Sequence, residues 1–129
     1  MIKIPEQIIE AILRQAYDEL PNEACGLLAG AGDVVCAHYP LTNTDHSPEH
    51  FSFDPQEQFL VLRDARSHGW KIIACYHSHP ASPARPSVED IRLAYDPKIG
   101  YLIVSLATHP PVIKAFRIID GRVTEEMLE

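Results

Sequence analysis

One apolar segment that ends at a proline constrains the fold more than any other feature. The run KIIACYHSH, residues 71–79, is rich in β-branched and apolar residues and is predicted to be a strand. Pro80 follows it directly, and Pro83 and Pro86 come soon after. Proline lacks the amide hydrogen that a sheet ladder needs, so the strand has to end at His79 and the next residues stay extended and stiff.

The N-terminal part of the chain predicts a helix followed by a hairpin. From Pro5 to Leu20, apolar residues recur at three- and four-residue steps, which is typical of one face of an amphipathic helix. The segments EACGLLAG and VVCAHYPL flank the glycine-rich turn GAGD and predict two mostly buried strands. Residues 43–53 are polar and indicate an exposed loop or a short edge strand, with Phe51 and Phe53 near its end.

A second helix is predicted to begin after Asp54. Asp54 supplies an N-cap, Pro55 occupies the first helical position and Glu57 places an acid at the third. Gly69 ends the helix, whose apolar residues are Phe59, Leu62 and Ala65.

The remaining segments complete one domain of the α/β (α+β) class. SVEDIRLAYD predicts a short helix opened by Ser87, and GYLIVSLA, VIKAFRII and RVTEEML predict three further strands. The order α-β-β-α-β-α-β-β-β indicates a mixed sheet with helices packed on it. We therefore expect residues 1–129 to form a single domain, which at this length can bury a core without disulfides.

Composition excludes several classes of protein. The formal net charge of −7, with 11 basic residues in no cluster, argues against nucleic-acid binding. No apolar run approaches the roughly 20 residues that a membrane span requires. Cys25, Cys36 and Cys75 form no CxxC pair, which fits a reducing compartment. We expect a cytoplasmic protein with no membrane partner; the sequence does not indicate its oligomeric state.

His77 and His79 lie two residues apart on the predicted strand and therefore project from the same face. A bare H-x-H is more often a pair of ordinary histidines than a metal site. Here the stiff loop leads to a helix start at which Ser87 and Asp90 match a capping box. In that position Asp90 can also serve as a third ligand. Two imidazoles and a carboxylate suit a catalytic zinc ion with an open position. The same set also describes the site of non-haem iron oxygenases.

Hydrolysis at such a metal also requires a proton carrier. Glu89 adjoins Asp90 but points about 100° away around the helix and is expected to face solvent. Glu23 begins an apolar strand, where burial of a carboxylate is unfavourable unless the site uses it, so Glu23 is the candidate proton carrier. A simple strand-end charge is the alternative interpretation.

These residues together resemble the JAMM (MPN-plus) metalloprotease motif, E…H-[ST]-H-P-x6-S-x-x-D. Every element is present, with ten residues between His79 and Asp90, and PNEACGLLAG, FSFDP and YLIVSLA extend the likeness. The resemblance, closest to small stand-alone prokaryotic members, implies a curved mixed sheet flanked by helices, similar to cytidine deaminases. It implies one zinc ion held by His77, His79 and Asp90, with Glu23 as general acid/base and Ser87 stabilising the oxyanion.

The resemblance also implies a reaction and a partner. Family members cleave isopeptide or peptide bonds after the C-terminal Gly-Gly of ubiquitin or ubiquitin-like proteins. Small bacterial members act on ubiquitin-like sulfur carriers, releasing an amino acid such as cysteine or trimming the carrier. Only six residues separate Pro80 from Ser87, which argues against linkage-specific deubiquitination. A non-catalytic MPN scaffold is the other alternative, although such relatives lack parts of the motif.

Other residues near the motif are expected to have structural roles. We expect Cys75 and Cys25 in the core, the Ser78 hydroxyl in a structural hydrogen bond, and Arg85 either solvated or in contact with substrate. An extended tail could add as a strand beside NTDHSPEHFSF. Surface positions are predicted for the remaining histidines, which are His38, His46, His50, His68 and His109.

Overall fold

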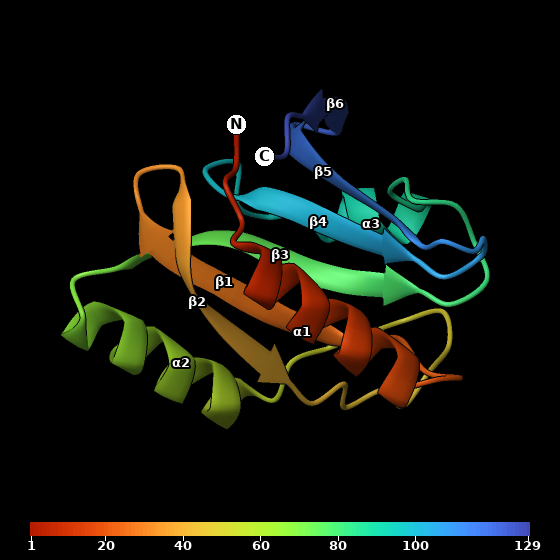
Figure 1. The fold of residues 1–129 in the computed structure, drawn as a ribbon, viewed down its shortest axis with the longest axis horizontal. Coiled ribbons are helices and arrows are strands. Elements are labelled where there is room, and N and C mark those ends of the chain that lie inside the picture. Colours follow the sequence, from red (N-terminus) through yellow and green to blue (C-terminus); the bar gives the residue numbers. More distant parts are fainter.

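A single mixed sheet organises residues 1–129 in the computed structural model (Figure 1). Its strand order is β2-β1-β3-β4-β5-β6; β3 and β4 are parallel and every other neighbouring pair is antiparallel. The predicted order of helices and strands is confirmed. The strands are β1 (Cys25–Ala31), β2 (Val34–Leu41), β3 (Lys71–His79), β4 (Gly100–Ser105), β5 (Val112–Ile119) and β6 (Arg122–Glu126), and the helices are α1 (Glu6–Asp18), α2 (Pro55–Ser67) and α3 (Val88–Arg92).

Helix α1 covers one face of the sheet (Figure 1). Ile12 and Ala16 are its buried residues, and they pack in the largest apolar cluster of the protein. The predicted apolar face is confirmed, but the helix ends at Asp18 rather than at Leu20. A turn closed by a hydrogen bond from Asn22 N to Glu19 O follows the helix, so Leu20 is left 44% exposed.

Helices α2 and α3 contact the opposite face of the sheet through two separate apolar clusters. The Asp54 side chain caps α2 as predicted, accepting a hydrogen bond from Gln56 N at 2.9 Å. Val61 and Ala65, one helical turn apart, form the buried face of α2. Of the apolar residues expected in this helix, Ala65 is buried, whereas Phe59 and Leu62 are 61% and 41% exposed.

The segment of residues 43–53 is more closely packed than a free surface loop. Its ends pair like a short edge strand, with Thr44 N donating to Ser52 O at 3.0 Å and a bridge between Asn43 and Phe53. Asn43 is buried. The segment also folds against the start of β1, where Glu23 N donates to Ser47 O at 2.8 Å. This segment therefore forms one side of the region around Glu23.

A buried polar contact joins α1, β2 and β3 on the face that α1 covers. The Tyr76 hydroxyl donates to Gln15 Oε1 at 2.5 Å and lies 2.6 Å from His38 Nε2. Burial lowers the pKa of His38. The predicted surface position of His38 is thus wrong, because its ring packs beside Tyr76. No helix has the length and apolar character needed to cross a bilayer.

Candidate metal centre

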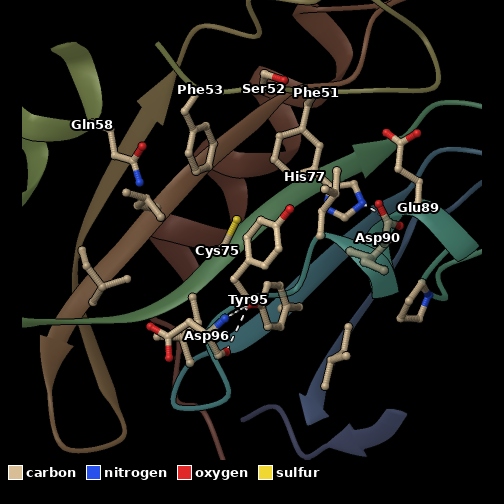
Figure 2. Close-up of a pocket in the computed structure, with 18 of the residues that line it drawn as sticks. Phe51, Ser52, Phe53, Gln58, Cys75, His77, Glu89, Asp90, Tyr95 and Asp96 are labelled. Atoms are coloured by element: carbon tan, nitrogen blue, oxygen red, sulfur yellow. Dashed lines mark hydrogen bonds and ion pairs between the residues drawn. The ribbon is translucent and has the colours of Figure 1, made fainter. Parts of the chain in front are cut away.

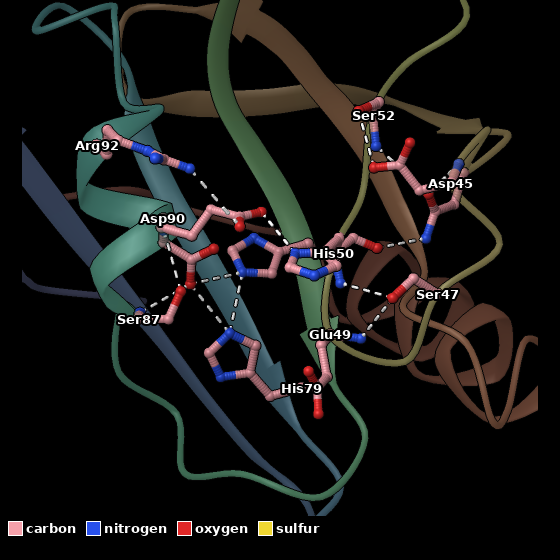
Figure 3. A network of polar contacts seen from close by, with 12 residues as sticks. Asp45, Ser47, Glu49, His50, Ser52, His79, Ser87, Asp90 and Arg92 are labelled. Atoms are coloured by element: carbon pink, nitrogen blue, oxygen red, sulfur yellow. Dashed lines mark hydrogen bonds and ion pairs between the residues drawn. The ribbon is translucent and has the colours of Figure 1, made fainter.

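Three potential ligands meet where β3 ends and α3 begins (Figure 3). His77 Nε2 and His79 Nε2 are 3.1 Å apart, and each lies 3.1 Å from Asp90 Oδ2. Both histidines are buried, and Asp90 is partly buried. The structure thus brings together the three residues that strand parity and the helix start had indicated, and they are arranged so that they can hold a metal ion.

The helix start fixes the position of the Asp90 carboxylate. Ser87 Oγ accepts a hydrogen bond from Asp90 N at 3.0 Å, and Ser87 N donates to Asp90 Oδ2 at 2.9 Å. The predicted capping box is confirmed. The same carboxylate oxygen faces both histidines, so the cap that begins α3 also orients Asp90 toward them.

The loop after β3 orients the second histidine. His79 Nδ1 lies 2.9 Å from the carbonyl oxygen of Pro83. A carbonyl only accepts, so Nδ1 carries the proton, and in the neutral ring Nε2 presents its lone pair toward His77 and Asp90. The sequence indicated a stiff loop here but gave no sign that a loop carbonyl selects the tautomer of His79.

The two histidines differ in how the site affects their protonation. Burial lowers the pKa of His77. Burial also disfavours the charged form of His79, but hydrogen bonds with Asp90 and the Pro83 carbonyl, together with the charge of Asp90, outweigh it and raise the pKa of His79 in the metal-free protein. Burial favours the neutral form of Asp90, but the hydrogen bonds with the two imidazoles outweigh it and hold the pKa of the carboxyl well below its usual range. A metal ion would take the place of the proton on His79 Nε2 and bind its lone pair. A negative oxygen and two imidazole nitrogens therefore face one another in a largely water-excluded space, which is a donor set suited to a cation.

Glu23 is buried beside this centre with an unsatisfied oxygen. Only 4% of the residue is exposed, and Oε1 has no hydrogen-bond partner. Burial raises the pKa of Glu23 to about 8, with the charge of His79 opposing the rise and that of Asp90 adding to it. A buried carboxyl without a partner is costly, so its presence next to three ligands fits a site built around a metal and its water.

The three side chains have the chemistry and orientation needed to bind a divalent metal ion. Two imidazoles, one with its tautomer fixed, and a pre-oriented carboxylate match the three protein ligands of catalytic zinc sites. Iron(II) accepts the same ligands. The sequence predicted these three residues as ligands, and the structure adds the hydrogen bonds that orient His79 and Asp90.

An apolar groove of about 550 Å³ opens directly beside the metal centre, with His77 and Asp90 in its lining (Figure 2). Leu27, Cys75 and Tyr101 lie along it on neighbouring strands of the sheet. Cys75 is buried and burial raises the pKa of its thiol to about 12, which confirms its predicted core position and makes it a poor nucleophile. Cys25 is also buried, as predicted.

Aromatic side chains line the groove where it meets His77. The ring of Phe51 stacks on the imidazole of His77, with centroids 4.7 Å apart and planes at 23°. Phe53 packs against Phe51 and also lines the groove. The sequence indicated the segment that holds both rings as one beside which an extended tail could bind, but no pattern in it predicted the stack on His77.

An ion pair links the segment 43–53 to α3 beside the ligands (Figure 3). His50 Nδ1 lies 2.8 Å from Glu89 Oε1. Glu89 is partly exposed, consistent with the prediction that it faces solvent, but it also lines the groove, and its Oε2 lies 3.8 Å from Arg92 Nη2. Arg85, predicted as solvated or substrate-binding, is exposed and forms no ion pair; its contact with substrate stays a prediction.

Ser87 and Ser78 differ in their exposure and in the hydrogen bonds that their hydroxyls form. Ser87 is exposed, and its hydroxyl accepts from Asp90 N, which leaves the O–H proton free to donate. Ser78 is 1% exposed and its hydroxyl accepts from Ala24 N at 2.8 Å. The structural hydrogen bond predicted for Ser78 is confirmed.

The chain is similar to proteins of known family and activity. The family described as prokaryotic homologs of the JAB domain matches residues 5–119. The CysO-cysteine peptidase of Mycobacterium tuberculosis is 36% identical over 98% of this chain and 88% of its own, and the desampylase of Haloferax volcanii is 35% identical over 78% and 74%. The solution structure of protein DSY2949 from Desulfitobacterium hafniense is 51% identical, with a TM-score of 0.91 over 100% of this chain and 92% of that one.

Proposed function

The chain belongs to the prokaryotic JAB-domain family, and from this premise we propose that it is a zinc-dependent peptidase acting on a ubiquitin-like carrier protein. The bond cleaved lies after the C-terminal Gly-Gly of the carrier, and cysteine or a short extension is released. The observation that carries the proposal is the convergence of three ligand atoms beside a buried glutamate with an unpartnered oxygen.

His77, His79 and Asp90 would hold the zinc ion in this proposal. When bound, zinc lowers the pKa of a coordinated water toward 7 and polarises the scissile carbonyl. The protein residues that surround it supply orientation: the Pro83 carbonyl fixes the tautomer of His79, and Ser87 N holds the Asp90 carboxylate.

Glu23 moves the proton. Burial raises the pKa of its carboxyl to about 8 in the metal-free protein, and the positive charge of a bound zinc ion would lower it, so that the carboxylate can accept a proton near neutral pH. It takes a proton from the attacking water and gives it to the leaving amine. The water-excluded position of Glu23 keeps this proton within the site.

Ser87 donates to the carbonyl oxygen as negative charge develops on it. Its hydroxyl is exposed and already accepts from Asp90 N, which orients the oxygen while leaving the proton available. A donor of this kind acts mainly in the transition state, because the charge is greatest there.

The groove beside the ligands receives the carrier's extended C-terminal tail. Its apolar lining suits side chains upstream of the glycines, and the glycines would lie where the groove reaches His77 and Asp90, beside the ring of Phe51. The relatives named for CysO-cysteine cleavage and for desampylation support a carrier-type substrate. The short connection between Pro80 and Ser87 favours a small leaving group over a second folded protein.

Two variants separate the role of Glu23 as proton carrier from the role of Asp90 as metal ligand. Glu23→Ala should abolish cleavage of a carrier–cysteine adduct while keeping stoichiometric zinc, because Glu23 is not a ligand. Asp90→Ala should lose zinc and activity together. Turnover retained by zinc-replete Glu23→Ala protein would contradict the proposed mechanism.

Metal analysis separates this proposal from the two alternatives. Anaerobically purified protein with stoichiometric zinc supports a hydrolase, whereas iron with oxygen consumption supports an oxygenase built on the same two histidines and carboxylate. Protein that binds no metal would support a scaffold. All five motif positions are intact here, which favours the enzyme.

A further inference from the structure

We propose that Ser78 and Asn43 are positioning residues that hold Glu23 in place for proton transfer. The inference rests on the proposed role of Glu23 and adds the side chains on which that role depends. Neither residue lies among the metal ligands. Both are buried, with 1% and 5% of their surface exposed, respectively.

The position of the Glu23 carboxylate has to be set through its backbone. Glu23 precedes the first residue of β1, so the regular ladder between β1 and β3 does not include it. Its Oε1 has no hydrogen-bond partner that could orient the side chain. The bonds made by the main chain of residues 23 and 24 therefore decide where the carboxylate lies.

Ser78 supplies one of these anchors from the middle of the His-Ser-His sequence. Its hydroxyl accepts from Ala24 N at 2.8 Å, and its own amide donates to Ala24 O at 2.9 Å. The hydroxyl thus takes the place that a backbone carbonyl would fill in a regular antiparallel pair. Because its neighbours are His77 and His79, this bond couples the register of Glu23 directly to that of two proposed ligands.

Asn43 supplies the second anchor from the other side. Its Nδ2 donates to Glu23 O at 3.0 Å and to His50 O at 2.9 Å, while its Oδ1 accepts from Asp45 N at 3.0 Å. The amide thus joins Glu23 to the segment 43–53. That segment also accepts from Glu23 N through Ser47 O.

Together the two side chains bind the two ends of one peptide group, the one that joins Glu23 to Ala24: Asn43 binds its carbonyl oxygen and Ser78 binds its amide. Buried hydrogen bonds of this kind are expensive to break, because the remaining partner is left unsatisfied. A small displacement of a proton carrier lowers the rate steeply, since a 1 Å error can reduce turnover on the order of 100-fold. The expected effect of losing an anchor is therefore a loss in kcat with little change in KM.

A matched pair of variants at Ser78 tests the inference. Threonine and valine have the same β-branched shape, but only threonine keeps the hydroxyl. Ser78→Thr should cleave a carrier–cysteine adduct at nearly the wild-type kcat, whereas Ser78→Val should lose about 10- to 100-fold in kcat per zinc-loaded protein, with KM and zinc content unchanged. Asn43→Asp, which replaces the donor with an oxygen, should show the same split between kcat and KM.

Amide hydrogen exchange supplies a readout that does not depend on activity. In zinc-free protein, the Ala24 amide should be protected in the wild type and in Ser78→Thr and should exchange faster in Ser78→Val. Equal kcat in the threonine and valine variants would overturn the inference, and if the valine variant does not fold, wild-type kcat in Asn43→Asp would overturn it. A wild-type protein that cleaves no carrier adduct would instead contradict the proposed function itself.

Discussion

Glu23→Gln should stabilise the metal-free protein increasingly as the pH rises, while removing the proposed proton carrier. Only 4% of Glu23 is exposed and Oε1 has no hydrogen-bond partner. Burial raises the pKa of its carboxyl from 4.5 to about 8, with His79 opposing and Asp90 adding to the rise. The folded protein thus holds a proton on Glu23 that the unfolded chain has already released.

The magnitude follows from the shift in pKa. The stability that comes from the neutral carboxyl is fully present below pH 4.5, and it is lost progressively as the pH rises through about 8. A shift of this size corresponds to about 5 kcal/mol of unfolding free energy across the window. That is a large fraction of the roughly 5 to 15 kcal/mol that stabilises a typical domain. Glutamine carries no titrating group, so its variant does not share the loss.

Urea unfolding of chelator-treated protein at a series of pH values from about 5 to 9 measures the effect. The unfolding free energy of the wild type should fall relative to that of Glu23→Gln by several kcal/mol over this range. Glu10→Gln is the matched control, because Glu10 is exposed on α1, and its curve should run parallel to the wild type. Parallel curves for wild type and Glu23→Gln would refute the reasoning that burial keeps Glu23 protonated.

Three other substitutions probe separate parts of the account. Ser87→Ala should lower kcat on a carrier adduct by about 100-fold because it removes the oxyanion donor, and Ser87→Thr should restore most of it; equal rates in both variants would exclude this role. Phe51→Ala removes the ring stacked on His77 and should raise KM about three- to tenfold in steady-state assays, and an unchanged KM would argue against a tail in the groove. Gly26→Ala should destabilise the protein by about 1 to 3 kcal/mol in thermal or urea unfolding, because a side chain there overlaps the ring of Tyr76; wild-type stability would contradict that packing.

The convergence of His77, His79 and Asp90 could be predicted because local rules govern it. Strand periodicity places His77 and His79 on one face, and the capping box places Asp90 in the first turn of α3. The prolines between them limit the path of the connecting loop. Each of these rules acts over a few residues, so the sequence contains the information directly.

The surroundings of the ligands depend on contacts between distant segments and could not be predicted in this way. The stack of Phe51 on His77 and the ion pair of His50 with Glu89 form because residues 43–53 fold back across the sheet. No periodic pattern in that polar segment indicates where it packs. The two buried hydrogen bonds of Asn43 to carbonyl groups likewise appear only once both ends of the segment are in place.

The orientation of α2 shows why an apolar pattern alone was insufficient. Phe59 and Leu62 are as apolar as the residues that are buried, yet Val61 and Ala65 face the sheet. Leu62 instead lines the groove beside the candidate metal centre. An apolar residue that lines a groove cannot be distinguished from a core residue by its position in the sequence.

Cleavage of a carrier–cysteine adduct with and without a chelator tests the central claim most directly. A ubiquitin-like carrier ending in Gly-Gly-Cys would be incubated with purified protein and its mass measured over time. The account predicts that cysteine is released after the second glycine, that chelation stops the reaction and that added zinc restores it. Cleavage that continues after complete removal of metal, or an adduct left intact by zinc-loaded protein, would contradict the account.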